Sequence, residues 1–288
     1  MSMVSLRLSF HGLIGLMVFF ALLPIARAVE GPHLSWATNQ EATPPARTKQ
    51  RLADQVEAVF QSELTLLLAA PSLPTDALWA LQEMDRILPN PKIAAFLSDK
   101  KADTSEKDVF WPLLEPTAKR PHLPDDPGSG SRKIYHFLLS SIGEPPERAI
   151  ALLTQFLSTR ESGYLLAHQF LVLEWARQTG LPLTAELQAK RGEVLGWILA
   201  EQEQDKQFSD LYAERTAILL LFSPPKPPLA QTWVKTILAA RKPSGGWGEF
   251  QTQLTYDGEH SILKHGTDHT RVLALLALRA YASSLKAQ

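Results

Sequence analysis

The helical segments of this chain alternate between two kinds, and this alternation constrains the fold more than any other feature of the sequence. Residues 164–176, 211–222 and 272–282 are apolar on nearly every side, as a helix must be when it packs on all faces. Between them, residues 185–203 and 229–241 have an apolar stripe opposite a polar face. Since no stretch has the period-two alternation of a sheet strand, the sequence predicts an all-α chain.

The same alternation extends toward the N-terminus. We expect a buried helix at residues 134–141, an amphipathic helix at 147–158, and a further helical pair at 50–68 and 75–88. Capping residues mark some of the limits: Thr184 precedes residues 185–203, and Ser209–Asp210 precede residues 211–222.

Alternating buried and half-exposed helices are typical of an α/α toroid or an open arc of inner and outer helix pairs. The expected inner helices begin near residues 164, 210 and 268, which gives a repeat of about 46 to 58 residues. An irregular bundle, in which buried and surface helices follow one another by chance, is the alternative.

The first 28 residues have the three parts of a cleavable signal peptide. Arg7 stands in a short n-region, an apolar run covers residues 13–23, and Ala26–Arg27–Ala28 forms a small-x-small cleavage site. The run is shorter than the ~20 residues of a membrane-spanning helix. We therefore expect cleavage between Ala28 and Val29 and a periplasmic or secreted protein with no stable membrane span; an uncleaved anchor is the alternative.

The rest of the chain predicts one domain. Residues 29–47 have little periodicity and predict an extended lead-in to a single helical domain at residues 48–288. Within this domain we expect a long loop around residues 99–131, a length that is usually functional or a linker. Trp111 and Leu113–Leu114 are expected to hold its middle against the helices.

Composition excludes several classes of function. The chain has no Cys, and therefore no disulfide, thiolate nucleophile or thiolate metal site. Its 29 Lys and Arg nearly balance its 30 Asp and Glu, so no global charge points to nucleic acid. Motifs for serine hydrolases, nucleotide binding and zinc peptidases are absent. No cofactor is predicted.

Polar residues recur at the starts of the apolar helices, and residues four apart share a helix face. The sets are Arg132 with His136, Tyr164 with His168, Asp210 with Glu214, and Asp268 beside His269 and Arg271. If the inner helices run parallel, their first turns meet at one mouth. The sequence then predicts catalytic roles for His168, Glu214 and Asp268. Ligand-binding roles are predicted for His136, Tyr164, Asp210, Trp247, His269 and Arg271.

Each of these residues also has a structural explanation. A His in an apolar helix commonly bonds to a backbone carbonyl, and an Asp in a first turn is favourable there without any function. Trp247 follows two glycines and can equally pack as an anchor for a turn. His265 and His269 have the spacing of paired metal ligands, but Gly266 disfavours a continuous helix through both, so no metal is predicted.

The C-terminal 45 or so residues combine three features. A Gly-Gly-Trp turn at residues 245–247 is followed by Thr267–Asp268–His269–Thr270 and a Leu/Ala-rich helix at residues 273–278. This order resembles one repeat of the terpenoid cyclase and protein prenyltransferase superfamily. The resemblance implies an α/α toroid and a hydrophobic, isoprenoid-like ligand. It does not carry the activity, because the Asp-rich cyclase motif and the Cys of the prenyltransferase zinc site are absent.

Two functions of different classes follow, and the sequence leaves open whether the protein is an enzyme. The first is a periplasmic protein that binds or processes a small lipid or saccharide in a central cleft, with a His and a carboxylate as base and acid. The second is a non-catalytic helical-repeat scaffold that binds a periplasmic protein or peptide on a concave face. A pocket with converging His and carboxylate groups favours the first.

Overall fold

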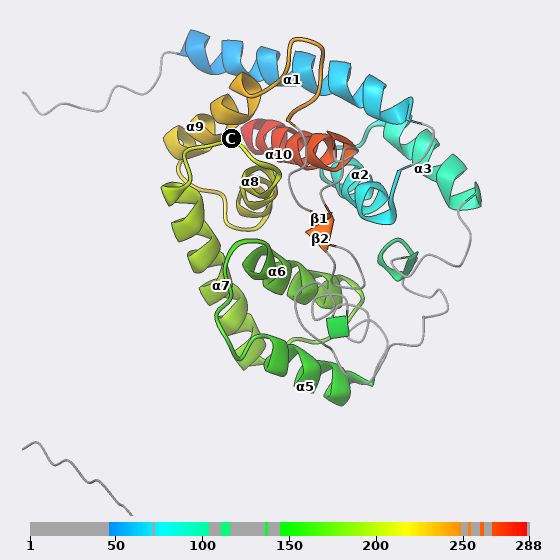
Figure 1. Ribbon diagram of the computed structural model, residues 1–288, viewed down its shortest axis with the longest axis vertical. Helices are drawn as coiled ribbons and strands as arrows, with labels where there is room; N and C mark the ends of the chain where they lie inside the picture. Colours follow the sequence, from blue (N-terminus) through cyan, green and yellow to red (C-terminus); the bar gives the residue numbers. More distant parts are fainter. Residues whose placement is uncertain are drawn as a thin grey trace, which may run out of the picture. The chain divides into compact units, whose positions relative to one another are not determined.

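The computed structural model describes residues 46–70, 73–103, 111–115, 136–137, 145–248, 253–254, 260–261 and 267–286. These residues form an all-α structure, as predicted (Figure 1). The helices are α1 (Ala46–Leu68), α2 (Thr75–Ile87), α3 (Pro91–Asp103), the short 3₁₀ helix η1 (Trp111–Leu113), α5 (Pro146–Phe156), α6 (Gly163–Gln178), α7 (Ala185–Gln204), α8 (Asp210–Phe222), α9 (Pro227–Ala239) and α10 (Thr267–Lys286).

Extended structure among the described residues is limited to one short pairing. Strands β1 (Gln253–Leu254) and β2 (His260–Ser261) have two residues each and pair antiparallel, with Gln253 opposite Ser261. They lie between α9 and α10 in the chain and form no larger sheet with other described residues.

The helices fall into two sets by burial. Helices α2, α6, α8 and α10 are inner helices; residues 212–220 of α8 and 272–281 of α10 are buried without interruption. Helices α1, α3, α5, α7 and α9 each have an exposed face and lie outside the inner set (Figure 1). The helices that the sequence marks as apolar on all sides are thus the buried ones. The closed toroid stays a prediction, since most residues between α3 and α5 lie outside the described part.

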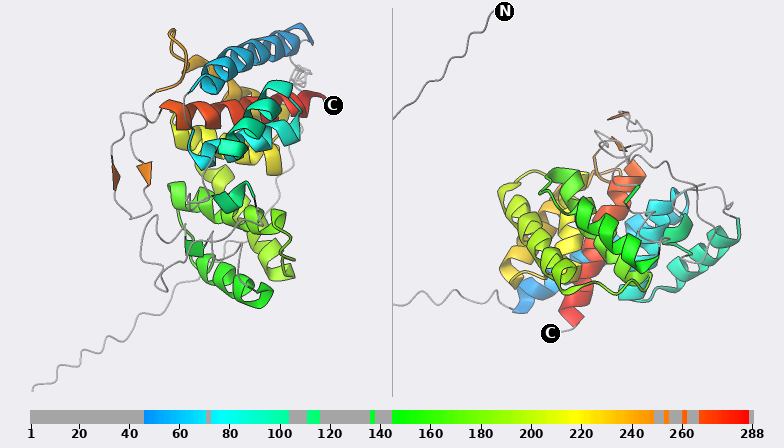
Figure 2. Two further views of the ribbon diagram at one scale, coloured as in Figure 1. Left: turned by 90° about the vertical axis from the view of Figure 1, so that its right-hand side faces the viewer. Right: turned by 90° about the horizontal axis from the view of Figure 1, so that it is seen from below.

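Helix α10 occupies the centre of the packing. It contacts α8, α2, α1 and α9, and lies between α1 and α8 (Figure 2). Its buried face is built from the Leu/Ala-rich stretch at residues 273–278. Because α10 packs against both α2 and α8, side chains at its start can meet those at the starts of these two helices.

The helix limits agree with the predicted capping residues. Thr184 accepts a hydrogen bond from the backbone N–H of Leu187, and Ser209 accepts one from the N–H of Tyr212. These bonds satisfy donors that a helix start otherwise leaves unpaired. They confirm the predicted starts of α7 and α8.

The predicted loop around residues 99–131 begins later than expected. Helix α3 was not predicted, and it continues to Asp103. Asn90 caps its start by accepting a hydrogen bond from the N–H of Lys92. Trp111 and Leu113–Leu114 are buried, as predicted. The rest of the loop lies outside the described residues.

The N-terminal predictions also lie outside the described residues. The signal peptide at residues 1–28, its cleavage site and most of the lead-in at residues 29–47 precede the first described residue. Helix α1 begins at Ala46, within the last residues of the predicted lead-in. Of the described helices, none combines the length and the hydropathy that are needed to cross a bilayer.

Candidate functional site

Side chains from the first two turns of four inner helices meet at one end of the inner set. His269 of α10 lies between two carboxylates: its Nε2 is 3.4 Å from Oδ2 of Asp76, and its Nδ1 is 3.8 Å from Oδ2 of Asp210. Beside them, Nδ1 of His168 lies 3.8 Å from Oε1 of Glu214. We call this group the inner-helix cluster; it comprises Asp76, Tyr164, His168, Asp210, Glu214 and His269.

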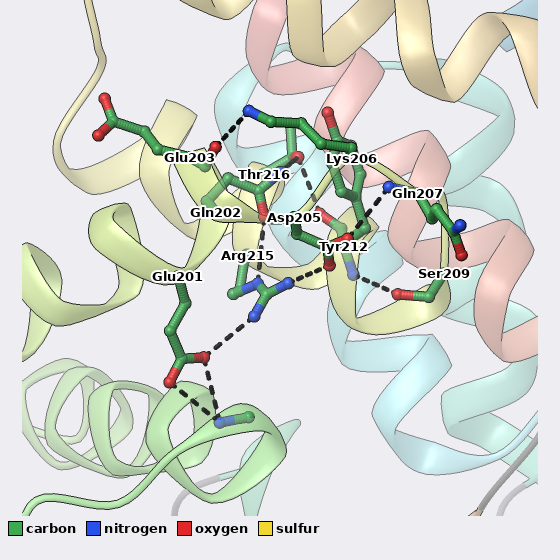
Figure 3. A network of polar contacts seen from close by, with 11 residues as sticks. Glu201, Gln202, Glu203, Asp205, Lys206, Gln207, Ser209, Tyr212, Arg215 and Thr216 are labelled. Atoms are coloured by element: carbon green, nitrogen blue, oxygen red, sulfur yellow. Dashed lines mark hydrogen bonds and ion pairs between the residues drawn. The ribbon is translucent and has the colours of Figure 1, made fainter.

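A buried arginine on α8 fixes the starts of α6 and α8 relative to each other (Figure 3). Arg215 is 5 % exposed; it donates to Glu201 at 3.0 Å and to Gln202 at 3.1 Å, both on α7. Glu201 also accepts the backbone N–H of Gly163, the first residue of α6, at 3.1 Å. One ion-pair network therefore sets the distance between the cluster residues of α6 and those of α8.

His168 is a neutral imidazole with one ring nitrogen available. Its Nδ1 lies 2.8 Å from the carbonyl oxygen of Tyr164. A carbonyl only accepts, so Nδ1 carries the hydrogen and Nε2 carries the lone pair. Burial, with a smaller contribution from the neighbouring His269, lowers the pKa of His168 to about 4, and the hydrogen bond to Tyr164 opposes this shift. Nε2 makes no hydrogen bond to a described residue, and the side chain is 21 % exposed. The lone pair of Nε2 is therefore an acceptor that the described residues leave unused.

Glu214 is a carboxylic acid at neutral pH. Its side chain is 6 % exposed, and its Oε2 is buried without a hydrogen-bond partner among the described residues. Burial, with a smaller contribution from the nearby Asp210, raises the pKa of Glu214 to about 8, while Arg215 opposes the shift. Buried carboxyl groups are nearly always hydrogen-bonded, so one that is not, next to a base, is a functional-site candidate.

Asp210 and Tyr164 form the second half of the cluster. Burial raises the pKa of Asp210, while hydrogen bonding to the Tyr164 hydroxyl and the charge of His269 oppose the rise. Burial, together with Asp210, raises the pKa of Tyr164 well above its usual value, so Tyr164 stays a phenol that can donate. Oδ2 of Asp210 is buried and has no hydrogen-bond partner among the described residues. The single hydroxyl hydrogen of Tyr164 is used by Asp210, so the pair offers one unused acceptor, Oδ2 of Asp210.

Asp268, predicted as the third catalytic residue, belongs to a different network. Its Oδ1 accepts from Nη1 of Arg271 at 2.8 Å, and Nε of Arg271 donates to Glu63 of α1 at 3.1 Å. No contact of the described residues joins Asp268 to the cluster. Successive helix residues point about 100° apart, so only one of Asp268 and His269 can face the cluster, and it is His269. Arg271, predicted to bind the ligand, is likewise engaged by Glu63 and Asp268.

Trp247, predicted to stack on a ligand, is an anchor of the turn instead. It is fully buried, and its Nε1 donates to the carbonyl of Ile237 at 2.6 Å. The preceding Gly245 and Gly246 have φ of +91° and +74°, a region that favours glycine. The backbone N–H of Gly246 donates to Glu63 at 2.9 Å. The Gly-Gly-Trp turn thus serves packing, the alternative that the sequence left open.

The structure assigns neither His136 nor a metal ion to the cluster. The ring of His136 lies edge-on to Phe137, with centroids 5.5 Å apart. Within the described part of the chain, no three His, Asp or Glu side chains are arranged to hold a metal ion. His265, the other half of the possible metal pair, lies outside the described residues.

Asp76 is the cluster residue that sequence reasoning missed. It lies in the first turn of α2, which was predicted as part of a helical pair at residues 75–88. The rule that selected Asp210, an acidic residue in the first turn of a buried helix, selects Asp76 as well. It was overlooked because the helix at residues 75–88 was not recognised as one of the inner helices.

Comparisons of this chain with protein-family models, with curated proteins and with solved structures found no match. The function is therefore argued from the cluster and its chemistry. The resemblance of the C-terminal residues to the terpenoid cyclase and prenyltransferase repeat stays a prediction.

Proposed function

We propose that this protein binds a hydroxyl-rich ligand, a saccharide rather than a lipid, at the inner-helix cluster, and that Glu214 acts there as an acid beside His168. The observation that carries the proposal is a protonated, unbonded carboxyl group 3.8 Å from a neutral imidazole. Oε2 of Glu214 and Nε2 of His168 have no hydrogen-bond partner among the described residues. A bound ligand would supply a partner to each.

The two pKa shifts suggest different roles for the two side chains. An acid is most effective when its pKa lies near the working pH, and the pKa of Glu214, about 8, meets this condition. The pKa of His168, about 4, makes Nε2 a good hydrogen-bond acceptor and a weak base at neutral pH. We therefore assign proton donation to Glu214, and the orientation of a ligand hydroxyl to His168.

The polar lining of the cluster supports a saccharide over a lipid. Hydroxyl groups both donate and accept, and the cluster offers the donor Glu214 with the acceptors His168 and Asp210. A hydrocarbon tail would leave these groups buried and unpaired, which costs on the order of several kcal/mol. The carboxyl groups also disfavour an anionic ligand, so we expect a neutral saccharide.

The signal-peptide pattern at residues 1–28 suggests that this function is performed outside the cytoplasm. We propose that the mature chain begins at Val29. Intact-mass measurement of protein from the periplasmic or secreted fraction tests this directly. A mass that retains Met1 to Ala28 would contradict it.

The ligand proposal is tested with neutral tetrasaccharides: cello-, malto-, xylo- and chito-tetraose. Binding is measured by isothermal calorimetry, and turnover by mass spectrometry of the products. The variants are Glu214→Gln, His168→Gln and, as a matched control, Glu203→Gln, an exposed residue at the end of α7. We expect one or more sugars to bind, and His168→Gln to weaken that binding about tenfold. Glu214→Gln should retain binding and lower any turnover by roughly 100-fold or more.

Two results would contradict the proposal. If no tetrasaccharide binds at millimolar concentration, the ligand class is wrong. If a sugar binds equally well to all variants, it binds elsewhere. Stable capture of one peptide or protein partner, unaffected by His168→Gln and Glu214→Gln, would instead support the scaffold function. The Glu203→Gln control should match the unsubstituted protein in every assay.

A further inference from the structure

A cavity of about 500 Å³ lies at the C-terminal end of α10, at the opposite end of that helix from the inner-helix cluster. It is lined by α1, by the junction of α2 and α3, and by the last turns of α10. Its volume is within the range of small-molecule sites. The proposed saccharide site uses none of its residues, so a second ligand could bind here independently.

Arg279 provides a buried cation in the wall of this cavity. It is 4 % exposed, and its guanidinium lies 4.8 Å from the ring centroid of Phe60. Nη2 donates to the carbonyls of Leu88 and Pro89, at the end of α2. Nε is buried without a partner, and Nη1 makes no hydrogen bond to a described residue. Burial lowers the pKa of Arg279, but a guanidinium stays charged in proteins. Arg279 therefore adds to the lining of the cavity a cation whose Nη1 is not used by the described residues.

Acidic side chains also line the cavity. Asp54 and Glu57 of α1 line the cavity and are exposed, and each accepts a hydrogen bond from a neutral glutamine. Neither has a cationic partner within salt-bridge distance among the described residues. Lys286, exposed at the end of α10, adds a second positive charge to the side of Arg279. The cavity is thus lined by two acids and two bases, and the charge of Glu57 acts on Arg279 without a salt bridge between them.

Apolar side chains also line the cavity. Leu88 and Leu285 line the cavity along with Ala53 and Ala282. A carboxylate alone would meet the acids of α1, and an ammonium alone would meet Arg279. A ligand with both charges and an apolar side chain satisfies every group.

We propose that this cavity binds a zwitterion with an apolar side chain, either a free amino acid or a dipeptide. Its carboxylate lies against Arg279 and Lys286, and its ammonium lies against Asp54 and Glu57.

The test is a titration of the full chain, followed by NMR, with L-leucine and the dipeptide Leu-Leu. Three analogues remove charge: isocaproate has only the carboxylate, isoamylamine has only the ammonium, and N-acetyl-leucine methylamide has neither. We expect leucine or Leu-Leu to bind with a Kd of about 1 mM or lower and each analogue to bind at least about tenfold more weakly.

Substitutions of residues that line the cavity test whether the ligand binds there. Glu57→Gln and Lys286→Gln change exposed residues, and each should weaken binding about three- to tenfold. Arg279→Lys keeps the charge and loses the guanidinium fork, so it should weaken binding further, with folding checked by circular dichroism. Lys235→Gln, exposed on α9, is the matched control and should change nothing.

Three results would overturn this proposal. The first is that neither leucine nor Leu-Leu binds at concentrations up to about 10 mM, tenfold above the expected Kd. The second is equal binding of isocaproate and leucine, which would show that the ammonium plays no part. The third is binding that Glu57→Gln and Lys286→Gln both leave unchanged. Substitutions of His168 or Glu214 should have no effect in this assay, so its outcome is independent of the saccharide proposal.

Discussion

Two buried glutamates, Glu63 in α1 and Glu214 in α8, have the same side chain and opposite surroundings. Glu63 is fully buried and accepts three hydrogen bonds: from Arg241 at 2.7 Å, from the N–H of Gly246 at 2.9 Å, and from Arg271 at 3.1 Å. Glu214 is 4 % exposed and accepts none from the described residues. Burial alone therefore does not decide what a carboxyl group does; its partners do.

Glu63 and Glu214 differ in what their carboxyl groups connect. Glu63 joins α1 to the Gly-Gly-Trp turn and to α10, three segments far apart in the sequence. Both carboxylate oxygens of Glu63 accept hydrogen bonds. Glu214 stays protonated beside His168 and has no hydrogen-bond partner among the described residues. We infer that the first site stabilises the fold and that the second is available to a ligand.

The largest expected effect is on the paired glutamate. Glu63→Gln leaves the half-buried Arg241 and Arg271 without their carboxylate; loss of one partner of a buried ion pair costs up to about 3–5 kcal/mol. Urea unfolding at pH 7 measures the change. The matched control is Glu57→Gln, an exposed residue on the same helix, which should change stability by less than ~0.5 kcal/mol. A loss below about 1 kcal/mol for Glu63→Gln would show that this network does not hold the fold.

The unpaired glutamate should behave in the opposite way. The pKa of Glu214 is raised from 4.5 to about 8, so folding favours its protonated form. The contribution of Glu214 to the free energy of unfolding is therefore fully present below pH 4.5 and is lost as the pH rises to 8. Glu214→Gln keeps a neutral side chain at every pH. It should be as stable as the unsubstituted protein near pH 4 and roughly 2–4 kcal/mol more stable at pH 9.

Urea unfolding across this pH range measures the difference. Glu203→Gln, an exposed control, should follow the unsubstituted protein at every pH. A Glu214→Gln variant that is less stable at pH 9 would mean that Glu214 is ionised and paired in the folded protein. A difference that is equal at all pH values would mean that folding does not shift the pKa of Glu214.

A smaller effect is expected at the turn that Glu63 holds. Gly246 has φ of +74°, and an added Cβ would lie 2.9 Å from Nη2 of Arg271. Gly246→Ala should therefore destabilise the protein by about 1–3 kcal/mol. Gly192→Ala is the matched control: it lies inside α7, where an added Cβ meets nothing within 4 Å, and it should stabilise by about 0.5–1 kcal/mol. Thermal unfolding of the two variants should move in opposite directions; a shift in the same direction would refute the account of the turn.

The smallest effect is expected at Asp268. Its side chain is 36 % exposed and pairs with Arg271, and exposed ion pairs contribute about 0–1 kcal/mol. Asp268→Asn should change stability within this range and leave ligand binding unaffected. If this variant loses ligand binding and keeps normal stability, Asp268 takes part in the function, as the sequence predicted.

Local patterns in the sequence predicted much of the fold. The apolar helices, the caps at Thr184 and Ser209, and the meeting of His168 with Glu214 all follow from spacing within one or two helices. The choice between Asp268 and His269 could not be made, because an uncertainty of one residue in a helix start rotates its faces by about 100°. Helix α3 was missed because residues 99–103 read as the start of a loop.

Long-range contacts could not be predicted at all. Glu63 looks like any polar residue on an amphipathic helix, and its partners follow it by 178 or more residues. The burial of Trp247 likewise depends on how the turn packs, so its sequence fits a ligand stack and a core anchor equally well. Such residues acquire their roles only from the tertiary structure.

The central claim is that Glu214 remains protonated at neutral pH beside a neutral His168. A ¹³C NMR titration of the glutamate side-chain carboxyl carbons tests it directly, with the Glu214 signal assigned by its absence in Glu214→Gln. We predict a midpoint near 8 for Glu214, and a His168 ring that stays neutral until the pH falls to about 4. A Glu214 midpoint near 4.5, the ordinary value, would contradict the account.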